Sequence, residues 1–576
     1  MSVSENRDLH RQVSGSGWGF TRISGQTLLC YGLIAILCLL VVYPMVSLIY
    51  GSFASHGGAA DGGLSLANFS RIFTSGQFWL AWRNTLIVST GSMLIATVSG
   101  VGAAFLIART DIPGRRICEV LVTLPIFISP FIGAVAWSGL GAPEVGLLNR
   151  IFAAIGLPLS INIYSLAGIA MVLGFYMTPY VFLFTSAPLK AIDSSMEEAS
   201  RLSGQTMFQT LLRVTFPLVT PSILAAGLLV FVLSMENFGV LAVLGMPSQI
   251  PFIPTEIYLK VAYPPPDYGY ATVISISFVI ITAVALLLQR RFIAGRTYIS
   301  VSGKSYRPML VSLGPWRWVA LGGLILFVSI STLMPLATMV TASFQSYWTT
   351  QFTNFTTINY ESVFSRGLFF RAAWNTLFLA MVGGLIACVL TAVIAYIVTF
   401  SRASGRHTLD LLSSMTVGVP GVVLGVALLW AWIRVPLPIY GTIWILMIAY
   451  ITRFLSFGVR NMSAALTQID GDLENAARVS GANKTVAALT ITFPLIRESL
   501  LSSWVLYFIS FVKELNTSVL LYAFNSVVLP VLIFDAYFEG KYPEVAALGT
   551  GISLFILAVY LVSNFIFGLK VGQKAG

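Results

Sequence analysis

The sequence predicts an all-α polytopic membrane protein of about 12 transmembrane helices, arranged as two homologous six-helix units. Three observations support this fold class. The 576 residues are 57% hydrophobic and only 10% charged, with a mean hydropathy of +0.86. Apolar runs of roughly 20 residues, the length of a helix that crosses a bilayer, recur along the whole chain. The first half of the sequence also matches the second half at a fixed distance.

The apolar runs are the first of these elements. A chain of this composition cannot hide its apolar side chains in one water-soluble core, so lipid must be part of its solvent. The runs should be helices, because helices satisfy their own backbone hydrogen bonds in lipid and the runs lack the alternation of barrel strands. They begin near Leu28, Thr85, Ile117, Ile161, Leu218, Ala271, Trp318, Thr376, Leu409, Pro438, Leu495 and Ala546.

The distribution of basic residues predicts the orientation. Arg7, Arg11 and Arg22 precede the first apolar run and no small-residue cleavage site follows promptly, which predicts a signal anchor kept in the mature protein. The net charge of +11 lies in short loops between the runs, so it indicates the positive-inside rule and no nucleic-acid partner. An even number of crossings places both termini in the cytoplasm, in a multi-pass protein of the bacterial inner (plasma) membrane.

An internal repeat divides the chain. Four sets of residues recur 291 positions later: Pro44 with Ser52-Phe53, Asn68-Phe69, Asn84-Thr85-Leu86 and Gly114-Arg115 recur as Pro335 with Ser343-Phe344, Asn359-Tyr360, Asn375-Thr376-Leu377 and Gly405-Arg406. With six spans in each copy, both copies enter the membrane in the same direction, as a parallel repeat about an axis along the membrane normal. The predicted segments are a cytoplasmic N-terminal tail (1–27), a first six-helix unit (28–290), a basic cytoplasmic linker (291–315), a second six-helix unit (316–570) and a C-terminal tail (571–576).

A polar motif occurs twice, between the fourth and fifth predicted spans of each half. Its residues are Glu197, Glu198, Ala199, Ser200, Gly204 and Pro217 in the first half and Glu474, Asn475, Ala476, Ala477, Gly481 and Pro494 in the second. The spacing inside the two copies is identical, but the copies lie 277 positions apart and not 291. The halves therefore differ in length somewhere between the earlier matches and this motif.

This motif resembles the EAA loop of ABC importer permeases: Glu-Ala-Ala, three residues, Gly, nine residues, then an aliphatic residue, any residue, a hydrophobic residue and Pro. Ser200 and Asn475 depart from that pattern. The resemblance implies a type I ABC importer permease fold, in which this loop is the coupling helix that docks in a groove of the ATPase subunit. The small residues allow close approach to a partner, the glycine should end the helix, and the proline should start the next span.

The resemblance also implies the partners. Gly303-Lys304-Ser305 is similar to the end of a phosphate loop, but Tyr298 stands where the first glycine should be and no strand precedes it. We therefore expect no ATPase site, no catalytic residue and no cofactor in this chain, and expect ATP to be bound by two separate ABC ATPase subunits. A periplasmic substrate-binding protein should deliver the solute. No metal-ligand spacing is present among the cysteines and histidines, so no resident metal site is expected.

Ionisable residues inside predicted spans are candidates for the substrate path, because charge is costly in lipid. The fifth span of each half carries such residues at nearly corresponding positions, Glu236-Asn237 and Lys513-Glu514. We expect them to line or gate the pore, although Glu236 and Glu514 could instead bind cargo or pair with Lys513 and nearby hydroxyls. Glu119 should lie near the cytoplasmic edge of the third span.

The fused layout and Lys513-Glu514-Leu515 resemble the permeases of ferric-iron importers, with Asn516 where those relatives often have proline. Ferric iron is the expected cargo by this resemblance; aminoethylphosphonate, thiamine, polyamine or a similar small solute are alternatives by the same mechanism. A secondary transporter is the alternative from a different class. It would not require paired coupling loops, and it would be expected to show more intramembrane acids or broken helices at the midplane. A membrane enzyme finds no support in the residues.

Overall fold

The computed structural model describes residues 25–54, 63–192, 194–293, 310–349, 354–470 and 472–567, and in these ranges the chain is helical with three isolated β-bridges. Most of the N-terminal tail, the linker tripeptide Gly303-Lys304-Ser305 and the C-terminal tail lie outside the described residues. The first half contains α1 (Gly25–Leu37), η1 (Cys38–Val42), α2 (Tyr43–Phe53), α3 (Ala67–Phe73), α4 (Gly76–Arg109), α5 (Arg115–Thr123), η2 (Leu124–Phe127), α6 (Pro130–Gly141), α7 (Leu147–Ala154), α8 (Leu166–Ala191), α9 (Ser194–Leu202), α10 (Met207–Thr210), η3 (Leu211–Thr215), α11 (Phe216–Met235), α12 (Phe238–Gly245), α13 (Ile253–Ala262) and α14 (Tyr268–Ile293).

The second half repeats most of this order. It contains α15 (Trp316–Val328), η4 (Ser329–Leu333), α16 (Met334–Ser343), α17 (Ile358–Ser365), α18 (Gly367–Phe378), η5 (Leu379–Gly383), α19 (Gly384–Phe400), α20 (Arg406–Met415), η6 (Thr416–Gly418), α21 (Gly421–Trp432), α22 (Ile443–Leu466), α23 (Asp472–Val479), α24 (Lys484–Ala487), η7 (Ala488–Thr492), α25 (Phe493–Leu495), α26 (Arg497–Val512), α27 (Ser518–Leu521), α28 (Leu529–Phe538) and α29 (Tyr542–Phe567). The segments η1, η3, η4, η5 and η7 are π-helical, and η2 and η6 are 3₁₀.

The predicted membrane spans are confirmed in place and number. Among the described residues, nine helices are long and apolar enough to cross a bilayer, and three bent pairs bring the total to 12 if each pair is one span. The pairs bend by 100° between η2 and α6, by 113° between η6 and α21, and by 70° between α25 and α26. Broken spans were expected of a secondary transporter. That criterion therefore does not separate the two classes, because Pro130 and Pro420 break spans here as well.

The sequence repeat corresponds to repeated hydrogen bonds. Asn68 Nδ2 donates to the carbonyls of residues 52 and 54, at 3.2 and 2.9 Å. Asn359 Nδ2 donates to the carbonyls of residues 343 and 345, the equivalent positions of the second half, at 2.9 and 2.7 Å. Thr85 Oγ1 accepts the backbone N–H of Ile253, and Thr376 Oγ1 accepts that of Leu529. The repeated polar residues therefore close equivalent loops in the two halves.

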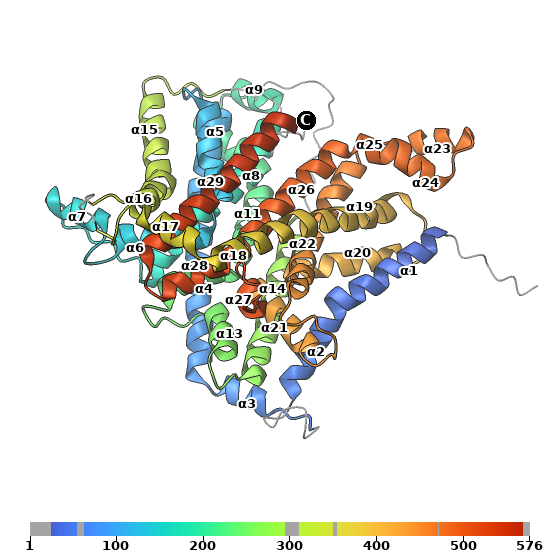
Figure 1. Ribbon diagram of the computed structural model, residues 1–576. Coiled ribbons are helices and arrows are strands. Elements are labelled where there is room, and N and C mark those ends of the chain that lie inside the picture. Colours follow the sequence, from blue (N-terminus) through green and yellow to red (C-terminus); the bar gives the residue numbers. More distant parts are fainter. Residues whose placement is uncertain are drawn as a thin grey trace, which may run out of the picture.

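The difference in length between the halves lies in one connection. α6 and α21 end 291 positions apart, at Gly141 and Trp432, whereas α8 and α22 begin only 277 positions apart, at Leu166 and Ile443. The longer first-half connection contains α7, which has no counterpart in the second half and projects from the left edge of the molecule in Figure 1. The sequence mismatch is thus one added helix and its loop.

The first span of each half packs against the other half. Cys30, Leu33 and Leu37 of α1 share a buried cluster with Ile394 of α19 and Leu409 of α20. Reciprocally, Leu324 and Val328 of α15 pack with Ala103, Ala104 and Phe182 of α4 and α8. The two sequence units are therefore interlocked in space. The boundaries given for them above stay a prediction about the sequence.

Candidate functional site

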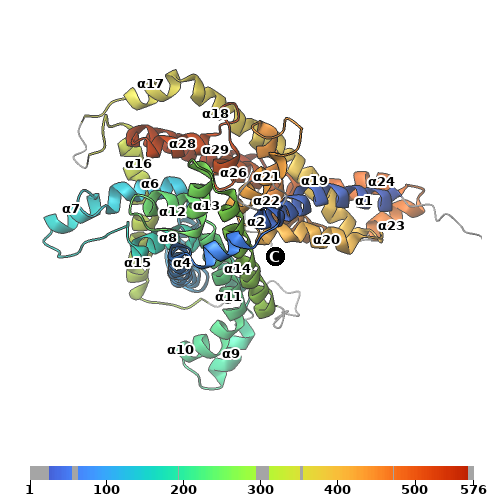
Figure 2. The same cartoon turned by 90° about the horizontal axis from the view of Figure 1, so that it is seen from below.

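The two copies of the repeated motif form short helices at separate ends of the molecule. α9 lies at the top of Figure 1 and α23 at its upper right, and the view in Figure 2 also places them far apart. Each helix ends two residues before a glycine in the left-handed region, Gly204 at φ +84° and Gly481 at φ +96°. Only glycine adopts this conformation without steric cost, so both glycines end their helices as the sequence predicts.

The proline of each motif does not start the next span, which corrects that part of the prediction. The fifth span of the first half begins at Met207, ten residues before Pro217. Pro217 follows the π-helical turn η3, in which the N–H of Phe216 bonds to the carbonyl of Leu211. Pro494 follows η7 in the same way. A wide turn before each proline accommodates a residue that has no N–H to donate. In the first half α11 then continues to Met235, whereas in the second half the span bends by 70° just after Leu495.

Adjacent acids of the motif point in opposite directions. Glu197 is buried and its Oε1 accepts a hydrogen bond from Thr215 Oγ1 at 2.6 Å, whereas Glu198 is exposed. In the second half Glu474 is half-buried and accepts a hydrogen bond from Thr492 Oγ1, and Asn475 is exposed. Thr215 and Thr492 are 277 positions apart, like the two glutamates. The residue that departs from the motif in the second half is thus on the exposed face.

The small residues of the motif have different surroundings. Ala199 and Ala476 are exposed, and Ala477 is half-buried. Ser200, the first-half departure, shares a hydrogen bond of 2.9 Å with Thr210 Oγ1, across the turn at Gly204. Its hydroxyl therefore ties α9 to α10, a contact that alanine could not make.

Both short helices expose large apolar side chains at equivalent positions. Leu202 is 90% exposed and Val479 is 91% exposed, and these residues are 277 positions apart. Met196 and Leu473, another equivalent pair, are 48% and 47% exposed. Each short helix therefore presents large apolar side chains to its surroundings at equivalent positions.

A cluster of buried charges lies where the two halves meet. Arg453 of α22 contacts both predicted glutamates: its Nη2 lies 3.4 Å from Glu236 Oε1 and its Nε lies 3.2 Å from Glu514 Oε2. The three side chains are only 11%, 16% and 6% exposed. Lys513 makes a different contact, donating from Nζ to the carbonyl of Ile126 at 2.7 Å, 387 residues away. Arg453 was missed by the sequence analysis, although an arginine inside an apolar run is a recognisable signal.

The predicted correspondence between Glu236 and Glu514 is shifted by one residue. Asn237 Oδ1 accepts the N–H of Val240, three residues on, and caps α12. Glu514 Oε1 accepts the N–H of Thr517, also three residues on. Because 237 and 514 differ by 277, Asn237 and Glu514 are the equivalent residues, and Glu236 corresponds to Lys513.

Interruptions in four helices converge on this charge cluster. Glu236 and Asn237 separate α11 from α12, and Lys513 and Glu514 follow the end of α26. Gly421, at the 113° bend, faces Arg453 so closely that a Cβ there would lie 2.1 Å from Nη1. Ile126, the acceptor for Lys513, belongs to η2 at the 100° bend. Bent spans from both halves therefore surround the charges.

Aromatic side chains from both halves pack next to the cluster. The ring centroids of Phe238 and Phe534 are 5.4 Å apart, and those of Tyr258 and Phe534 are 5.6 Å apart. Phe131 lies 6.1 Å from Phe534 on another side. Three aromatic rings of the first half thus pack against Phe534 of the second half. These contacts join the two halves next to the charge cluster.

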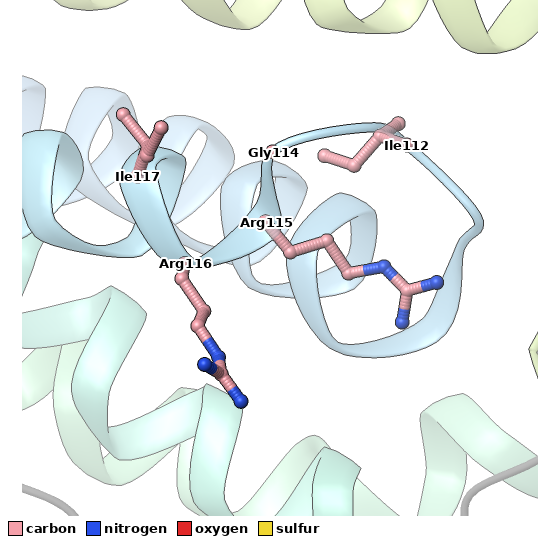
Figure 3. Close-up of a pocket in the computed structure, with 5 residues that line it drawn as sticks. All are labelled: Ile112, Gly114, Arg115, Arg116 and Ile117. Carbon is pink, nitrogen blue, oxygen red and sulfur yellow. The ribbon is translucent and has the colours of Figure 1, made fainter.

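Two further features lie near the end of the first half that carries α9. Glu119 of α5 pairs with Lys190 of α8 at 2.9 Å, both partly exposed. A shallow, open depression at the turn before α5 is lined by Ile112, Gly114, Arg115, Arg116 and Ile117, and the two arginine side chains extend from it (Figure 3). Two of the five residues that border the depression are arginines, as expected where the sequence predicts a cytoplasmic loop.

A comparison with protein families agrees with the two-unit architecture. The family model described as "Binding-protein-dependent transport system inner membrane component" matches residues 78–297 and 387–570, one match in each half. The chain is 28% identical to the ferric transport system permease protein of Actinobacillus pleuropneumoniae over 95% of this chain and 79% of that protein. It is 29% identical to a putative ferric transport system permease protein of Haemophilus influenzae over 85% of this chain and 76% of that protein. A solved bacterial ABC transporter involved in alginate import has a chain that is 22% identical, with a TM-score of 0.38, covering 47% of this chain and 97% of that chain.

Proposed function

The chain belongs to the binding-protein-dependent transport system inner membrane components, as a fused, two-unit permease of an ABC importer, and we propose a cargo for it on that basis. The proposed cargo is ferric iron. A periplasmic binding protein delivers the iron, and two separate ATPase subunits supply the energy. The single observation that carries the docking of two ATPases is the pair of equivalent helices α9 and α23, each with an almost fully exposed apolar side chain, Leu202 or Val479. ATP is hydrolysed by the partner subunits, and this chain supplies the path through the membrane.

The docking surfaces follow from the exposed faces of α9 and α23. Leu202 and Val479 are almost fully exposed on short polar helices, and burying both against a partner stabilises the complex by about 1.5–3 kcal/mol for each side chain. Gly204 and Gly481 fix where each helix ends, so the docked helix and the following span keep one geometry. Closure of the two ATPases on ATP then moves α9 and α23 toward one another. The fifth spans, which begin directly after the glycines, transmit this movement to the charge cluster.

Ferric iron as cargo is supported by the similarity to the two ferric-transport permeases along almost the whole chain. The charge cluster is compatible with that cargo, because Glu236 and Glu514 supply the oxygen ligands that a hard cation prefers. In this conformation both carboxylates form ion pairs with Arg453. We infer that the cluster gates the path, with Arg453 released from Glu236 when the two halves move apart.

The test begins with purification of the tagged chain from its native membrane and mass spectrometry of its partners. The chain, its ATPase and its binding protein are then placed in vesicles, and uptake of radioactive iron is measured with and without ATP. We expect uptake that needs both ATP and the binding protein. A different ligand on the recovered binding protein would replace iron as the cargo, and uptake driven by an ion gradient without ATP would overturn the proposal.

Two matched variants test the docking surface. Leu202→Asp together with Val479→Asp places a charge at each exposed apolar position, and we expect the ATPase to be lost from the purified complex while the chain still inserts in the membrane. Leu159→Asp is the control, because Leu159 is 60% exposed but lies in the connection after α7, away from both short helices. Retention of the ATPase by the double variant would contradict docking through α9 and α23.

A further inference from the structure

The first coupling helix, α9, is held by a fully buried ion pair. Arg109, the last residue of α4, contacts Glu197 of α9 through Nη2 and Oε2, and the two side chains are 0% and 1% exposed. Thr215 donates to the other oxygen of Glu197, and Arg109 Nη1 donates to the carbonyl of Leu189 near the end of α8 at 3.4 Å. One carboxylate and one guanidinium therefore fasten α9 to three other elements of the first half.

The second coupling helix, α23, lacks this ion pair. The position equivalent to Arg109, 291 positions later, is Phe400, which is also the last residue of its helix α19. Glu474 accepts hydrogen bonds from two hydroxyls instead, those of Thr492 and of Tyr396, the latter at 3.2 Å. Among the described residues no ion pair accompanies these hydrogen bonds of Glu474, whereas Glu197 pairs with a cationic side chain and is the more deeply buried carboxylate. The two helices are thus held with unequal strength.

The backbone of Arg109 is the docking point for the start of the second half. The carbonyl of Arg109 accepts the N–H of Val311 at 2.7 Å, and the N–H of Asp111 donates to the carbonyl of Val311 at 3.2 Å. Asp111 Oδ1 accepts the N–H of Leu313 at 2.9 Å. These residues lead directly into α15, which itself packs against α4 and α8. Residues 109–111 therefore join α9, α4 and the first span of the second half.

We propose that Arg109 is a positioning residue which makes the first coupling helix move as one body with α4 and α15, whereas the second coupling helix moves more freely. This inference rests on the proposed function in one respect, that α9 and α23 receive the movement of the ATPases. Through α9, that movement reaches α4 and, across the docked residues 311–313, the second half. Through α23 it passes without an ion pair, by way of the hydroxyls of Thr492 and Tyr396, to α19, which packs against α1.

Burial also assigns different roles to the two adjacent acids. The carboxylate of Glu197 faces Arg109 inside the first half and has no surface to offer a partner protein. Glu198 is on the exposed side of α9, where a docked subunit would lie. Substitution of Glu197 therefore acts through the position of α9, and substitution of Glu198 acts through contact with the partner.

Hydrogen exchange tests the inference on the full chain in lipid nanodiscs, with no partner present. We expect the backbone amides of α9 to exchange at least about tenfold more slowly than those of α23, because stronger contacts oppose local opening. Arg109→Met should raise the exchange rate of α9 to that of α23 and leave α23 unchanged. Phe400→Met, the same replacement at the equivalent position of the second half, is the matched control and should leave α9 unchanged; Phe400 packs on Tyr396, so only its effect on α9 is compared.

Two variants keep the test decisive if Arg109→Met fails to fold. Arg109→Lys keeps the positive charge but loses the fork geometry, and should give an intermediate exchange rate in α9. Glu197→Gln keeps the shape of the side chain and removes its charge, and should also speed exchange in α9. Equal exchange of α9 and α23 in the parent protein, or an unchanged α9 in all three variants, would overturn the inference.

Transport measurements on the complete complex separate this inference from the proposed function. Arg109→Met should retain both ATPase subunits, because the exposed face of α9 is untouched, but should import fewer ions for each ATP hydrolysed, because a loosened α9 transmits less of the movement. A transporter that needs no ATP would refute the proposed function and leave the exchange result standing. Unchanged ATP consumption per ion, with loosened α9, would refute the role of Arg109 in transmission.

Discussion

Replacing Arg453 by methionine should destabilise the protein more than any loss of a surface ion pair. The substitution leaves Glu236 and Glu514 without their shared partner, in a place where their side chains are only 16% and 6% exposed. Methionine fills a similar length of space without charge. The expected loss of stability therefore comes from two buried carboxylates without a partner, and not from a cavity.

The magnitude follows from the contacts. Arg453 lies 3.4 and 3.2 Å from the two carboxylates, and removing one partner of a buried ion pair costs about 3–5 kcal/mol. Removing all three charges together, with Glu236→Gln and Glu514→Gln added, should bring stability back to within about 1 kcal/mol of the parent, because no buried charge remains unpaired. The amide side chain introduced by Glu514→Gln would still accept the N–H of Thr517 through its carbonyl oxygen, so the local turn is preserved.

Thermal and denaturant unfolding of the chain in nanodiscs measures these differences. The control is Arg366→Met, which breaks a pair with Glu544 of 2.8 Å in which the arginine side chain is 45% exposed, and which should cost no more than about 1 kcal/mol. Uptake measured on the triple variant then shows whether the charge cluster gates transport, because that variant should fold but lacks the ion pairs of Arg453 with Glu236 and Glu514. An Arg453→Met variant as stable as Arg366→Met, or a triple variant no more stable than Arg453→Met, would refute the reasoning.

Three further predictions concern the loops. Gly204→Val should strain the left-handed turn by about 1–2 kcal/mol and reduce uptake without preventing membrane insertion. Gly204→Asn should have a smaller effect, because asparagine tolerates the left-handed region. Nothing lies within 4 Å of a Cβ added at position 204, so the effect comes from the backbone and not from a clash. Asn359→Ala should cost about 1–3 kcal/mol in thermal unfolding, because two buried carbonyls lose their donor, and an unchanged unfolding temperature would contradict this. The N–H of Leu313 is the main cause that lowers the pKa of Asp111, so the docking of residues 311–313 should be intact above about pH 4 and loosen as the pH falls through the lowered pKa. Spin labels at positions 116 and 314 should report a broader distance distribution at low pH, and Asp111→Asn should remove that pH dependence.

The spans and the repeat could be predicted from the sequence because both are properties of the chain in one dimension. A run of apolar residues needs no partner to be recognised, and all 12 predicted starts lie in or beside observed spans or bent pairs. The packing of α1 and α15 on the opposite halves could not be predicted, because a helix that is apolar all round gives no sign of which face meets protein and which meets lipid.

The candidate site could be predicted only in part, because the motif is local in the sequence but its partners are not. The motif gave the positions of α9 and α23, and neighbouring residues on a helix differ by about 100°, so Glu197 and Glu198 could not share a face. Which of them points inward depended on Arg109, 88 positions earlier in the chain. Arg109 ends a span, where a basic residue is ordinarily explained by the charge of the cytoplasmic loops, and nothing local distinguished this buried one. Arg453 was different, because an arginine within the apolar run of α22 was visible in the sequence.

The fusion of two units has a physical consequence for the charged positions. Two identical chains about a twofold axis place the same side chain at both equivalent positions, so a charge near the axis meets its like. Here Arg453 is equivalent to Tyr176, Glu236 to Lys513, and Glu514 to Asn237. Each half has diverged so that a carboxylate of the first half meets a guanidinium of the second, which two identical subunits could not arrange with these residues.

The same divergence separates the coupling loops. Arg109 corresponds to Phe400, and Glu197, the partner of Arg109, corresponds to Glu474. The backbone therefore keeps the pseudo-twofold symmetry that the proposed docking of two like ATPases requires, while the buried charges break it. An importer that hydrolyses ATP at two equivalent sites would then transmit the movement through two unequal connections. Transferring the ion pair to the second half, by Phe400→Arg in an Arg109→Phe background, should exchange the hydrogen-exchange rates of α9 and α23 if the buried charge alone sets the difference.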